Sequence, residues 1–288
     1  MANAKEIKRR MRSAKSNQQI TKAMKMVSAS KLRRAQGSVV SARPYKNKLK
    51  EVLARLVASM GSTATDPLLE KREVKKVGFV IFASNKGLCG GYNANIMKEA
   101  HARIKEAEAQ GLEIGIVAIG RKTKEYFLKH GYTLDEEFMN VADLPNAVDA
   151  DAITKVIKSY YTSGKYDEVC LVYNEFVSAM TQIPKTVKVL PIETPESESS
   201  EGLDYIFEPS PAEVLSQILP LYLANQVFSA LTEAKAGQHG ATMTAMTAAT
   251  DNATELLRKL DLSYNRARQA AITNEITEIV GGVNALNG

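Results

Sequence analysis

The chain has 288 residues, of which 44% are apolar and 24% charged, and its formal net charge is +6. These values are typical of a folded protein and exclude a disordered chain. Aromatic residues make up only 6% and tryptophan is absent, while Ala, Lys, Glu, Leu and Arg are plentiful. The composition therefore favours long helices over an aromatic-rich compact enzyme.

The first sixty residues predict one long, basic helix. Residues 1–50 hold fifteen Lys or Arg and one acid, Glu6. Such a block suits nucleic acid, anionic lipid or an acidic protein surface, and a solvated helix face is an equally ordinary interpretation. Apolar residues recur at spacings of three and four, with a one-residue slip between three groups: Ile7, Met11 and Ala14; Ile20, Met24 and Val27; Leu32, Ala35, Val39 and Ala42. A helix of this length, about 80 Å, needs a partner along its whole length.

The far end of the chain predicts that partner. Ser210, Pro211 and Glu213 form a helix-start pattern with an N-cap and a capping box, and we expect Pro220 to kink the helix without ending it. Two apolar runs then alternate steps of three and four, as in the seam of a coiled coil. They are Met246, Ala249, Ala253, Leu256 and Leu260, followed by Ile272, Ile276, Ile279, Val283 and Leu286.

Between these ends, short apolar strands alternate with helical segments. Strands are expected at 77–83, 114–119, 168–173 and 186–191, the last at an edge, and helices at 93–109, 123–129 and 149–161. This order predicts a parallel sheet, and the acidic stretch 194–202 predicts a flexible connection. The expected fold is an antiparallel two-helix coiled coil of residues 1–60 and 209–288, with a Rossmann-like α/β domain inserted at 74–193.

One glycine-rich turn invites a nucleotide-binding interpretation. The segment GLCGG, 87–91, follows a strand and precedes a helix, where backbone amides cradle phosphate in many α/β proteins. However, neither G-x-G-x-x-G nor G-x-x-x-x-G-K-[ST] is present, and Gly120 and Arg121 stand where an acid is expected after the next strand. A tight turn that needs glycine is the favoured interpretation.

No catalytic or metal-binding constellation is recognisable. Cys89 and Cys170 lack a C-x-x-C pattern, and the three histidines lie in expected helices without a triad context. We expect no cofactor, no metal and no disulfide, and a protein of the reducing cytoplasm. From the charged opening residues we expect no secretory signal, and we expect no run of about 18 apolar residues and no direct membrane insertion.

Two alternatives remain at this point. A basic coiled-coil protein that binds nucleic acid would interleave arginines with aromatic residues, but the first 44 residues contain no aromatic residue. A Rossmann-like enzyme with helical arms would be stabilised by ATP, ADP or NAD, which thermal shift tests. Salt-sensitive retention on DNA tests the first alternative.

Four segments carry a family resemblance. ITKAMKMVSASKLRRAQ at 20–36 and LSYNRARQAAITNEITEIVGG at 262–282 resemble the terminal signatures of the gamma subunit of F-type rotary ATP synthase. GLCGGYN at 87–93 and FEPSPAEVL at 207–215 resemble two internal motifs of that family. The resemblance implies a non-catalytic rotor shaft that couples ion-driven rotation of the c-subunit ring to ATP synthesis or hydrolysis in a ring of three alpha and three beta subunits. It also implies one copy per complex, contact with the epsilon subunit, and a peripheral place at the cytoplasmic face of a bacterial plasma membrane.

The resemblance also assigns candidate contact residues. Met24 matches a methionine near a beta subunit, and the beta-contact stretch at the other end is Arg268, Gln269, Thr273, Glu275 and Glu278. From the residues themselves, the uncharged last turns GGVNALNG suit rotation in an apolar collar, where a fixed ion pair would hold one angle. Our hypothesis is that a basic face guides acidic beta-subunit loops through Lys22, Lys25, Lys31, Arg33 and Arg34.

Two segments depart from the family pattern. Residues 237–243 read GQHGATM where the family commonly reads S-E-H-A-A-R-M, so that Gly237 and Gly240 enter a long helix. Each such glycine costs about 1 kcal/mol relative to alanine, which predicts a locally soft or bent helix. Asn85 and Lys86 replace a common Asp-Arg pair, so no salt bridge is assumed there.

Overall fold

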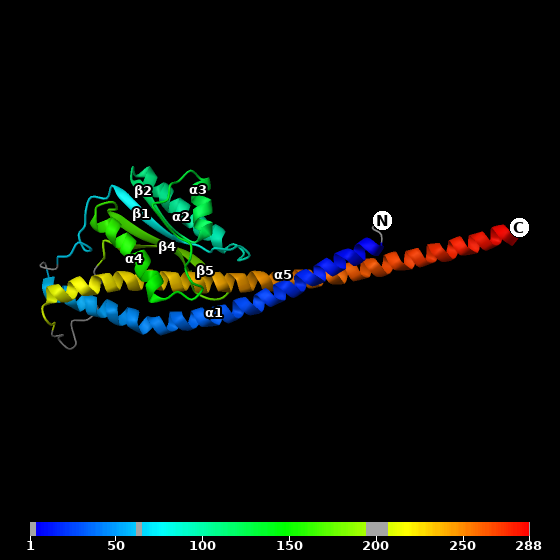
Figure 1. Ribbon diagram of the computed structural model, residues 1–288, viewed down its shortest axis with the longest axis horizontal. Helices are drawn as coiled ribbons and strands as arrows, with labels where there is room; N and C mark the ends of the chain where they lie inside the picture. The colour runs from blue at the N-terminus through cyan, green and yellow to red at the C-terminus, as the bar shows by residue number, and fades with distance from the viewer. Residues whose placement is uncertain (1–3, 62–64, 194–206, 288) are drawn as a thin grey trace. The chain divides into compact units, whose positions relative to one another are not determined.

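The computed structural model describes residues 4–61, 65–193 and 207–287 (Figure 1). Two compact units are distinguished, one formed by Met1–Val27 with Met243–Gly288 and the other by Ser28–Thr242. Two long helices contribute to both units: α1 spans Ala4–Met60 and α5 spans Pro211–Asn287. Pro44 and Pro220 lie inside these helices and end neither. The connection expected at 194–202 lies outside the described residues.

Burial along α1 follows steps of four and three without a slip. Ile7, Ala14, Ser28, Leu32, Ala35, Leu49, Leu53 and Leu56 are buried at these steps, and the positions between them in the same series are half-buried. The expected slip was wrong, because between Ala14 and Ser28 the packed series continues through three half-buried polar residues, Gln18, Thr21 and Lys25. Ile20 and Val27, placed on the seam by the sequence, are 54% and 55% exposed.

The first unit pairs the start of α1 with the second half of α5. Ile7 and Ala14 pack with Leu260, and Met11, Leu257 and Tyr264 border this cluster. Further along, Gln18 Nε2 donates to Thr254 Oγ1 at 2.7 Å and Thr250 Oγ1 donates to Thr21 Oγ1 at 2.8 Å. Leu257 therefore lies on the packed side, whereas Leu256, the residue we predicted there, is 45% exposed.

The last turns of α5 have no covering helix among the described residues. The two helices are antiparallel, and Gln18 lies opposite Thr254. Fourteen residues earlier on α1, Ala4 therefore lies opposite the region of Arg268 on α5. Every residue from 268 to 284 is exposed. The second apolar run was thus wrongly assigned to a seam with α1: Ile272, Ile276, Ile279 and Val283 are 47–65% exposed.

The second unit contains one mixed five-stranded sheet in the order β3-β2-β1-β4-β5. The strands are β1 Lys76–Phe82, β2 Glu113–Ile119, β3 Glu136–Phe138, β4 Glu168–Phe176 and β5 Gln182–Leu190. The first four are parallel and β5 runs antiparallel beside β4. The helices of the sheet are α2 Tyr92–Ala109, α3 Arg121–Lys129 and α4 Ala147–Thr162.

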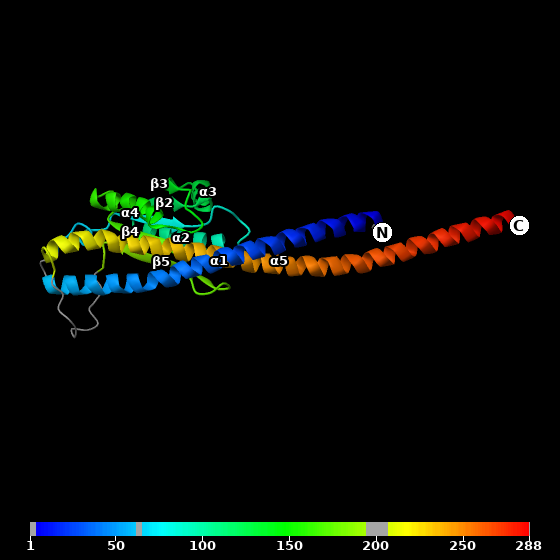
Figure 2. The same ribbon diagram turned by 60° about the horizontal axis from the view of Figure 1, so that its bottom comes forward.

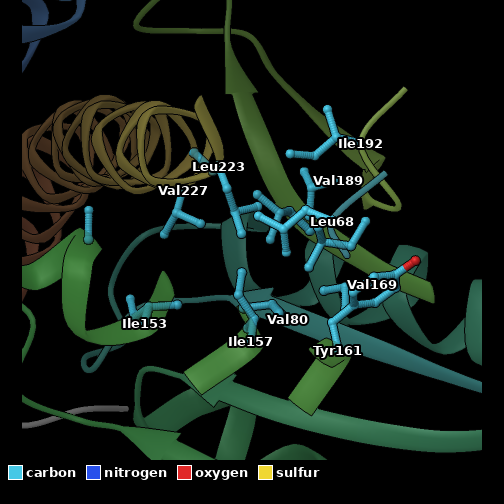
Figure 3. Close-up of a cluster of buried hydrophobic side chains, with 14 of the residues drawn as sticks. Leu68, Val80, Ile153, Ile157, Tyr161, Val169, Val189, Ile192, Leu223 and Val227 are labelled. Atoms are coloured by element: carbon cyan, nitrogen blue, oxygen red, sulfur yellow. The ribbon is translucent and has the colours of Figure 1, made fainter. Parts of the chain in front are cut away.

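Successive side chains of each strand point to opposite faces of the sheet, so the sheet contributes to two hydrophobic cores. On one face Val80 and Phe82 pack with α4 and with Leu219 and Leu223 of α5 (Figure 3). On the other face Phe79 and Ile81 pack with α2 and α3. Figure 1 shows α4 on the side of the sheet that faces α5 and α2 and α3 on the opposite side, and Figure 2 shows α4 again beside α5. A leucine fully buried in such a core contributes about 1.5–3 kcal/mol.

The α/β segment differs from the prediction in two places. The short strand β3 was missed, because its sequence EEF has no apolar run. The strand expected at 186–191 begins earlier, at Gln182, and forms an antiparallel hairpin with β4, so the sheet is not wholly parallel. The glycines of β1 and β2 have a packing reason: a Cβ on Gly78 or Gly115 would meet the Tyr166 ring at 2.4 or 2.3 Å.

The two unusual glycines of α5 lie where the helix touches the sheet. A Cβ on Gly237 would stand 3.2 Å from Gln182 Cγ and from Tyr92 Cε2, and one on Gly240 would stand 3.0 Å from the Ala179 carbonyl oxygen. The α5 helix is continuous through both. The sequence predicted a locally soft or bent helix at these glycines. In the structure the two positions are closely packed instead, which explains why they lack a side chain.

One membrane criterion is met by α5. By length and composition alone it contains an 18-residue window apolar enough to cross a bilayer, which the sequence analysis did not anticipate. Core helices of soluble proteins meet the same criterion.

Two alanine substitutions in helices test the packing role of Gly240. Gly240→Ala should destabilise the chain by about 1 kcal/mol, because the added methyl meets backbone atoms of the β4–β5 turn. Gly37→Ala, in α1, meets nothing within 4 Å and should stabilise by about 0.5–1 kcal/mol through helix propensity. Urea unfolding measures both, and equal stabilisation by the two substitutions would contradict the packing account.

Candidate functional site

The residues expected at the beta contact lie on the uncovered end of α5. Arg268, Gln269, Thr273, Glu275 and Glu278 are all exposed. Thr273 Oγ1 donates to the Gln269 carbonyl oxygen at 3.0 Å, a bond within the helix. The three charged side chains form no ion pair with any described residue. Each is available to a partner surface.

Met24, the other expected contact, lies elsewhere on the same unit. It is half-buried on α1. The hydrogen bond of Thr21 to Thr250 places this part of α1 beside α5 residues near 247. That is about twenty residues from Arg268, or roughly 30 Å along the helix at 1.5 Å per residue. The structure therefore does not bring Met24 together with the α5 stretch.

Of the five basic residues predicted to form one face of α1, some are exposed to solvent and others are half-buried. Lys22, Arg33 and Arg34 are exposed and Lys25 is half-buried. Lys31 is half-buried, and its Nζ pairs with Asp143 Oδ2 at 2.5 Å. The ammonium group of Lys31 lowers the pKa of the Asp143 carboxyl below its ordinary value. Lys31 thus anchors the segment between β3 and α4, a role that sequence reasoning missed.

Two further basic residues hold the same segment. On α5, Lys235 Nζ donates to the Val141 carbonyl oxygen at 3.2 Å. His239 is 5% exposed, contacts the Asp143 backbone, and its Nε2 is buried without a hydrogen-bond partner in the described structure. Burial lowers the pKa of His239 and that of Lys235. The 141–143 segment is held by α1 and α5 together.

The glycine-rich turn is closed by its own side chains. Asn93 Oδ1 accepts from the Ser84 amide at 3.1 Å, and Asn93 Nδ2 donates to Ser84 Oγ at 2.8 Å and to Cys89 Sγ at 3.1 Å. Left-handed backbone occurs at Leu88 and Gly90, with φ 64° and 57°. Gly90 adopts this conformation at no steric cost. These contacts favour a structural turn over a phosphate cradle.

Neighbouring residues of this turn also have structural partners. Asn85 Nδ2 donates to the Met139 carbonyl oxygen at 2.7 Å, and its Oδ1 accepts from the Arg121 amide at 2.8 Å. Asn85 thereby joins three loops that follow strands, without the charge pair of the family pattern. Lys86 is exposed and forms no ion pair with any described residue.

The two thiols are buried and poorly suited to nucleophilic chemistry. Cys89 and Cys170 are 2% and 7% exposed, and both are free. Burial, with Glu168 alongside, raises the pKa of Cys170 to about 12. A nucleophilic thiol needs the opposite environment, electropositive and accessible. No cluster of three metal-ligating side chains exists among the residues that the structure describes.

Comparison with known proteins gives consistent results over the whole chain. A family model described as ATP synthase matches residues 3–286. The ATP synthase gamma chain of Desulforamulus reducens is 50% identical over 287 residues, covering 99% of this chain and 100% of that relative. The ATP synthase gamma chain of Desulfitobacterium hafniense is 49% identical over 286 residues, with the same coverage.

Solved structures show the same fold. A chain in the central stalk and c-ring structure of Tetrahymena thermophila mitochondrial ATP synthase is 25% identical, with a TM-score of 0.60, covering 80% of this chain and 99% of that one. A chain in an F1 and c-ring structure of Euglena gracilis mitochondrial ATP synthase is 19% identical, with a TM-score of 0.68 and coverage of 98% and 94%.

Burial of neutral His239 predicts a loss of stability in mild acid. Its folded-state pKa lies below the unfolded value of about 6.5, so the unfolded chain binds more protons as pH falls. The free energy of unfolding should fall between pH 7.5 and 5.5, by at most about 1.4 kcal/mol per pH unit for one proton.

Substitution of single histidines separates the contribution of His239 to the pH dependence from that of other titrating groups. His239→Gln should flatten the pH dependence in that window, whereas His130→Gln, at the exposed end of α3, should leave it in place. Urea unfolding at several pH values measures both. A slope unchanged by His239→Gln would show that other groups cause it.

Proposed function

Because the chain belongs to the ATP synthase gamma-chain family, it is the central-stalk subunit of the F1 rotary complex, and we propose that α1 and α5 form its torque-bearing shaft. Its partners are the alpha and beta subunits, the epsilon subunit and the c-ring. Membrane association and ion transport are properties of the whole complex. The subunit is mechanical, and the ATP-processing chemistry belongs to its partners.

The shaft is proposed to be an antiparallel coiled coil of residues 1–60 and 209–288, with residues 74–193 as an inserted domain. The strict four-and-three burial series of α1 supports this, because a heptad series keeps one seam facing a partner helix. The contacts of Gln18 with Thr254 and of Thr21 with Thr250 support the antiparallel direction. The coiled coil is imperfect, since the seam contains polar side chains.

The observation that carries the proposal is the apolar stripe on the uncovered end of α5. Ile272, Ile276, Ile279, Val280 and Val283 are 47–65% exposed. A contiguous apolar patch of this kind marks an interaction site on a soluble protein. Residues 279–284 carry no charge, which suits a helix end that turns inside an apolar collar of alpha and beta subunits.

Charged and polar side chains beside this stripe are proposed to transmit torque. Arg268, Gln269, Thr273, Glu275 and Glu278 are exposed at the start of the uncovered segment, and Met24 provides a second, separate contact. On α1, the exposed Lys22, Arg33 and Arg34, with Lys25, are proposed to attract acidic beta-subunit surfaces. Each exposed ion pair contributes only about 0–1 kcal/mol. The attraction is therefore shared among several weak pairs, and no single pair holds the shaft at one angle.

The site of action is proposed to be the cytoplasmic face of a bacterial plasma membrane. The gamma chains of Desulforamulus reducens and Desulfitobacterium hafniense, both bacterial, support this place. Fractionation of the assembled complex after mild salt washing tests it, because a peripheral subunit stays with the complex.

A triple substitution tests the torque contact. Arg268→Ala, Gln269→Ala and Thr273→Ala together should change the free chain's stability by less than about 0.5 kcal/mol, since all three side chains are exposed. ATPase activity of the complex reconstituted with alpha and beta should fall at least about threefold, or roughly 0.7 kcal/mol. Arg258→Ala, Lys259→Ala and Ser263→Ala, also exposed on α5, are the matched control.

Equal effects of the two triple variants would remove the torque assignment. The same assay applies to the basic face: Arg33→Glu with Arg34→Glu should impair coupling more than Lys50→Glu with Lys71→Glu, two exposed lysines elsewhere. Failure of the unmodified chain to assemble with alpha and beta would contradict the shaft itself.

A further inference from the structure

Side chains of α2 and α3 line a groove. These two helices lie on the face of the sheet opposite α4 (Figure 1). Its volume is about 640 Å³. None of the contacts proposed above uses it. The lining residues that matter are Ala94, Met97, Lys98, Ala102, Tyr126 and Lys129.

The floor of the groove is apolar and open because its α2 residues are small. Ala94 and Ala102 are exposed, while Met97 is 4% exposed and Tyr126 is half-buried. Ala94, Lys98 and Ala102 follow one another at steps of four, so they share one face of α2. Two methyl groups on this face leave space for larger apolar side chains. The shape suits the ridge of a packed helix.

The rim of the groove is positively charged. Lys98 and Lys129 have no acidic partner within the described structure, while Lys122 pairs with Glu125 at 2.5 Å. Of the described residues that line the groove, Glu125 alone is acidic, so the charges of Lys98 and Lys129 remain uncompensated there. A ligand that fills the apolar floor must therefore carry carboxylates at its edges to complement the rim.

We propose that this groove binds an amphipathic helix of another protein, with an apolar stripe flanked by Asp and Glu. Helix-in-groove recognition uses apolar anchors at steps of three and four, which match the alanine spacing of α2. Nucleic acid fits the groove less well, because its floor is apolar and an acid stands at the rim. No described residue of α1 or α5 lines the groove. It can therefore be occupied while the two long helices contact the alpha and beta subunits.

Peptide binding to the full chain tests the proposal. The probe is a fluorescent 18-residue helical peptide with Leu at steps of three and four and Glu at the flanking positions. Its counterpart replaces every Glu by Lys and keeps the apolar stripe. Fluorescence anisotropy should show binding of the acidic peptide at least about tenfold tighter than that of the basic one.

Matched variants locate the site. Ala102→Glu fills the groove and adds a negative charge, and it should weaken binding of the acidic peptide at least about tenfold. Ala109→Glu, also exposed on α2 but outside the groove, should change it less than twofold. Both positions are exposed, and thermal unfolding verifies that each variant folds.

Three results would overturn the proposal: equal binding of the two peptides, equal effects of Ala102→Glu and Ala109→Glu, or absence of binding. Self-association of the free chain that Ala102→Glu abolishes would also overturn it, because the occupant would then be a second copy of this chain.

Discussion

The fold depends on the pairing of two helices that are too long to bury a face alone. A helix of 57 residues has an apolar stripe far longer than any small domain can cover, and most helical stability comes from packing such a stripe. In each unit α1 finds its cover on α5, through Ile7 and Leu260 in one and through Leu53 and Leu219 in the other. The two terminal helices therefore pair along their sides, and the α/β segment becomes an insertion between them.

The same constraint creates the free end. Because α5 has 77 residues and α1 has 57, part of α5 is left without α1 beside it. The uncovered part keeps an apolar stripe, Ile272 and Ile276 among it, and this stripe lies at the stretch that resembles the family's beta-contact signature. Excess helix length thus leaves an exposed apolar stripe, which we propose is covered by the partner subunits.

Close packing fixes the sheet against the paired helices. Tyr92 Oη donates to the Ala234 carbonyl oxygen at 2.7 Å, and glycine at 237 and 240 lets the helix backbone approach the β4–β5 hairpin. Lys31, Lys235 and His239 hold the segment after β3 against both helices. A rotor needs such rigidity, since torque is lost in soft joints. The departures from the family pattern at 237–240 are compatible with this function.

Sequence patterns predicted the long helices and most of the sheet, because long helical periods and buried apolar runs are strong signals. They failed where polar residues occupy the seam of α1: the half-buried Gln18 and Thr21 and the buried Ser28 lie on it, while Ile20 and Val27 do not. The strand β3 has no apolar run. The contacts of Lys31 and Asn85 join residues 36 to 112 positions apart, which no local pattern relates. Candidate contact residues came from family resemblance, since an exposed Arg268 has no physical signature in a single sequence.

The register of the helix pair is tested most directly by disulfide formation between introduced cysteines. Gln18→Cys with Thr254→Cys replaces two side chains joined by a 2.7 Å hydrogen bond, and the native thiols are buried. On mild oxidation this pair should crosslink within the chain. Gln18→Cys with Lys259→Cys, displaced by about 7 Å along α5, should crosslink at least about tenfold more slowly. Equal rates for the two pairs, or faster closure of the displaced pair, would contradict the register on which the account rests.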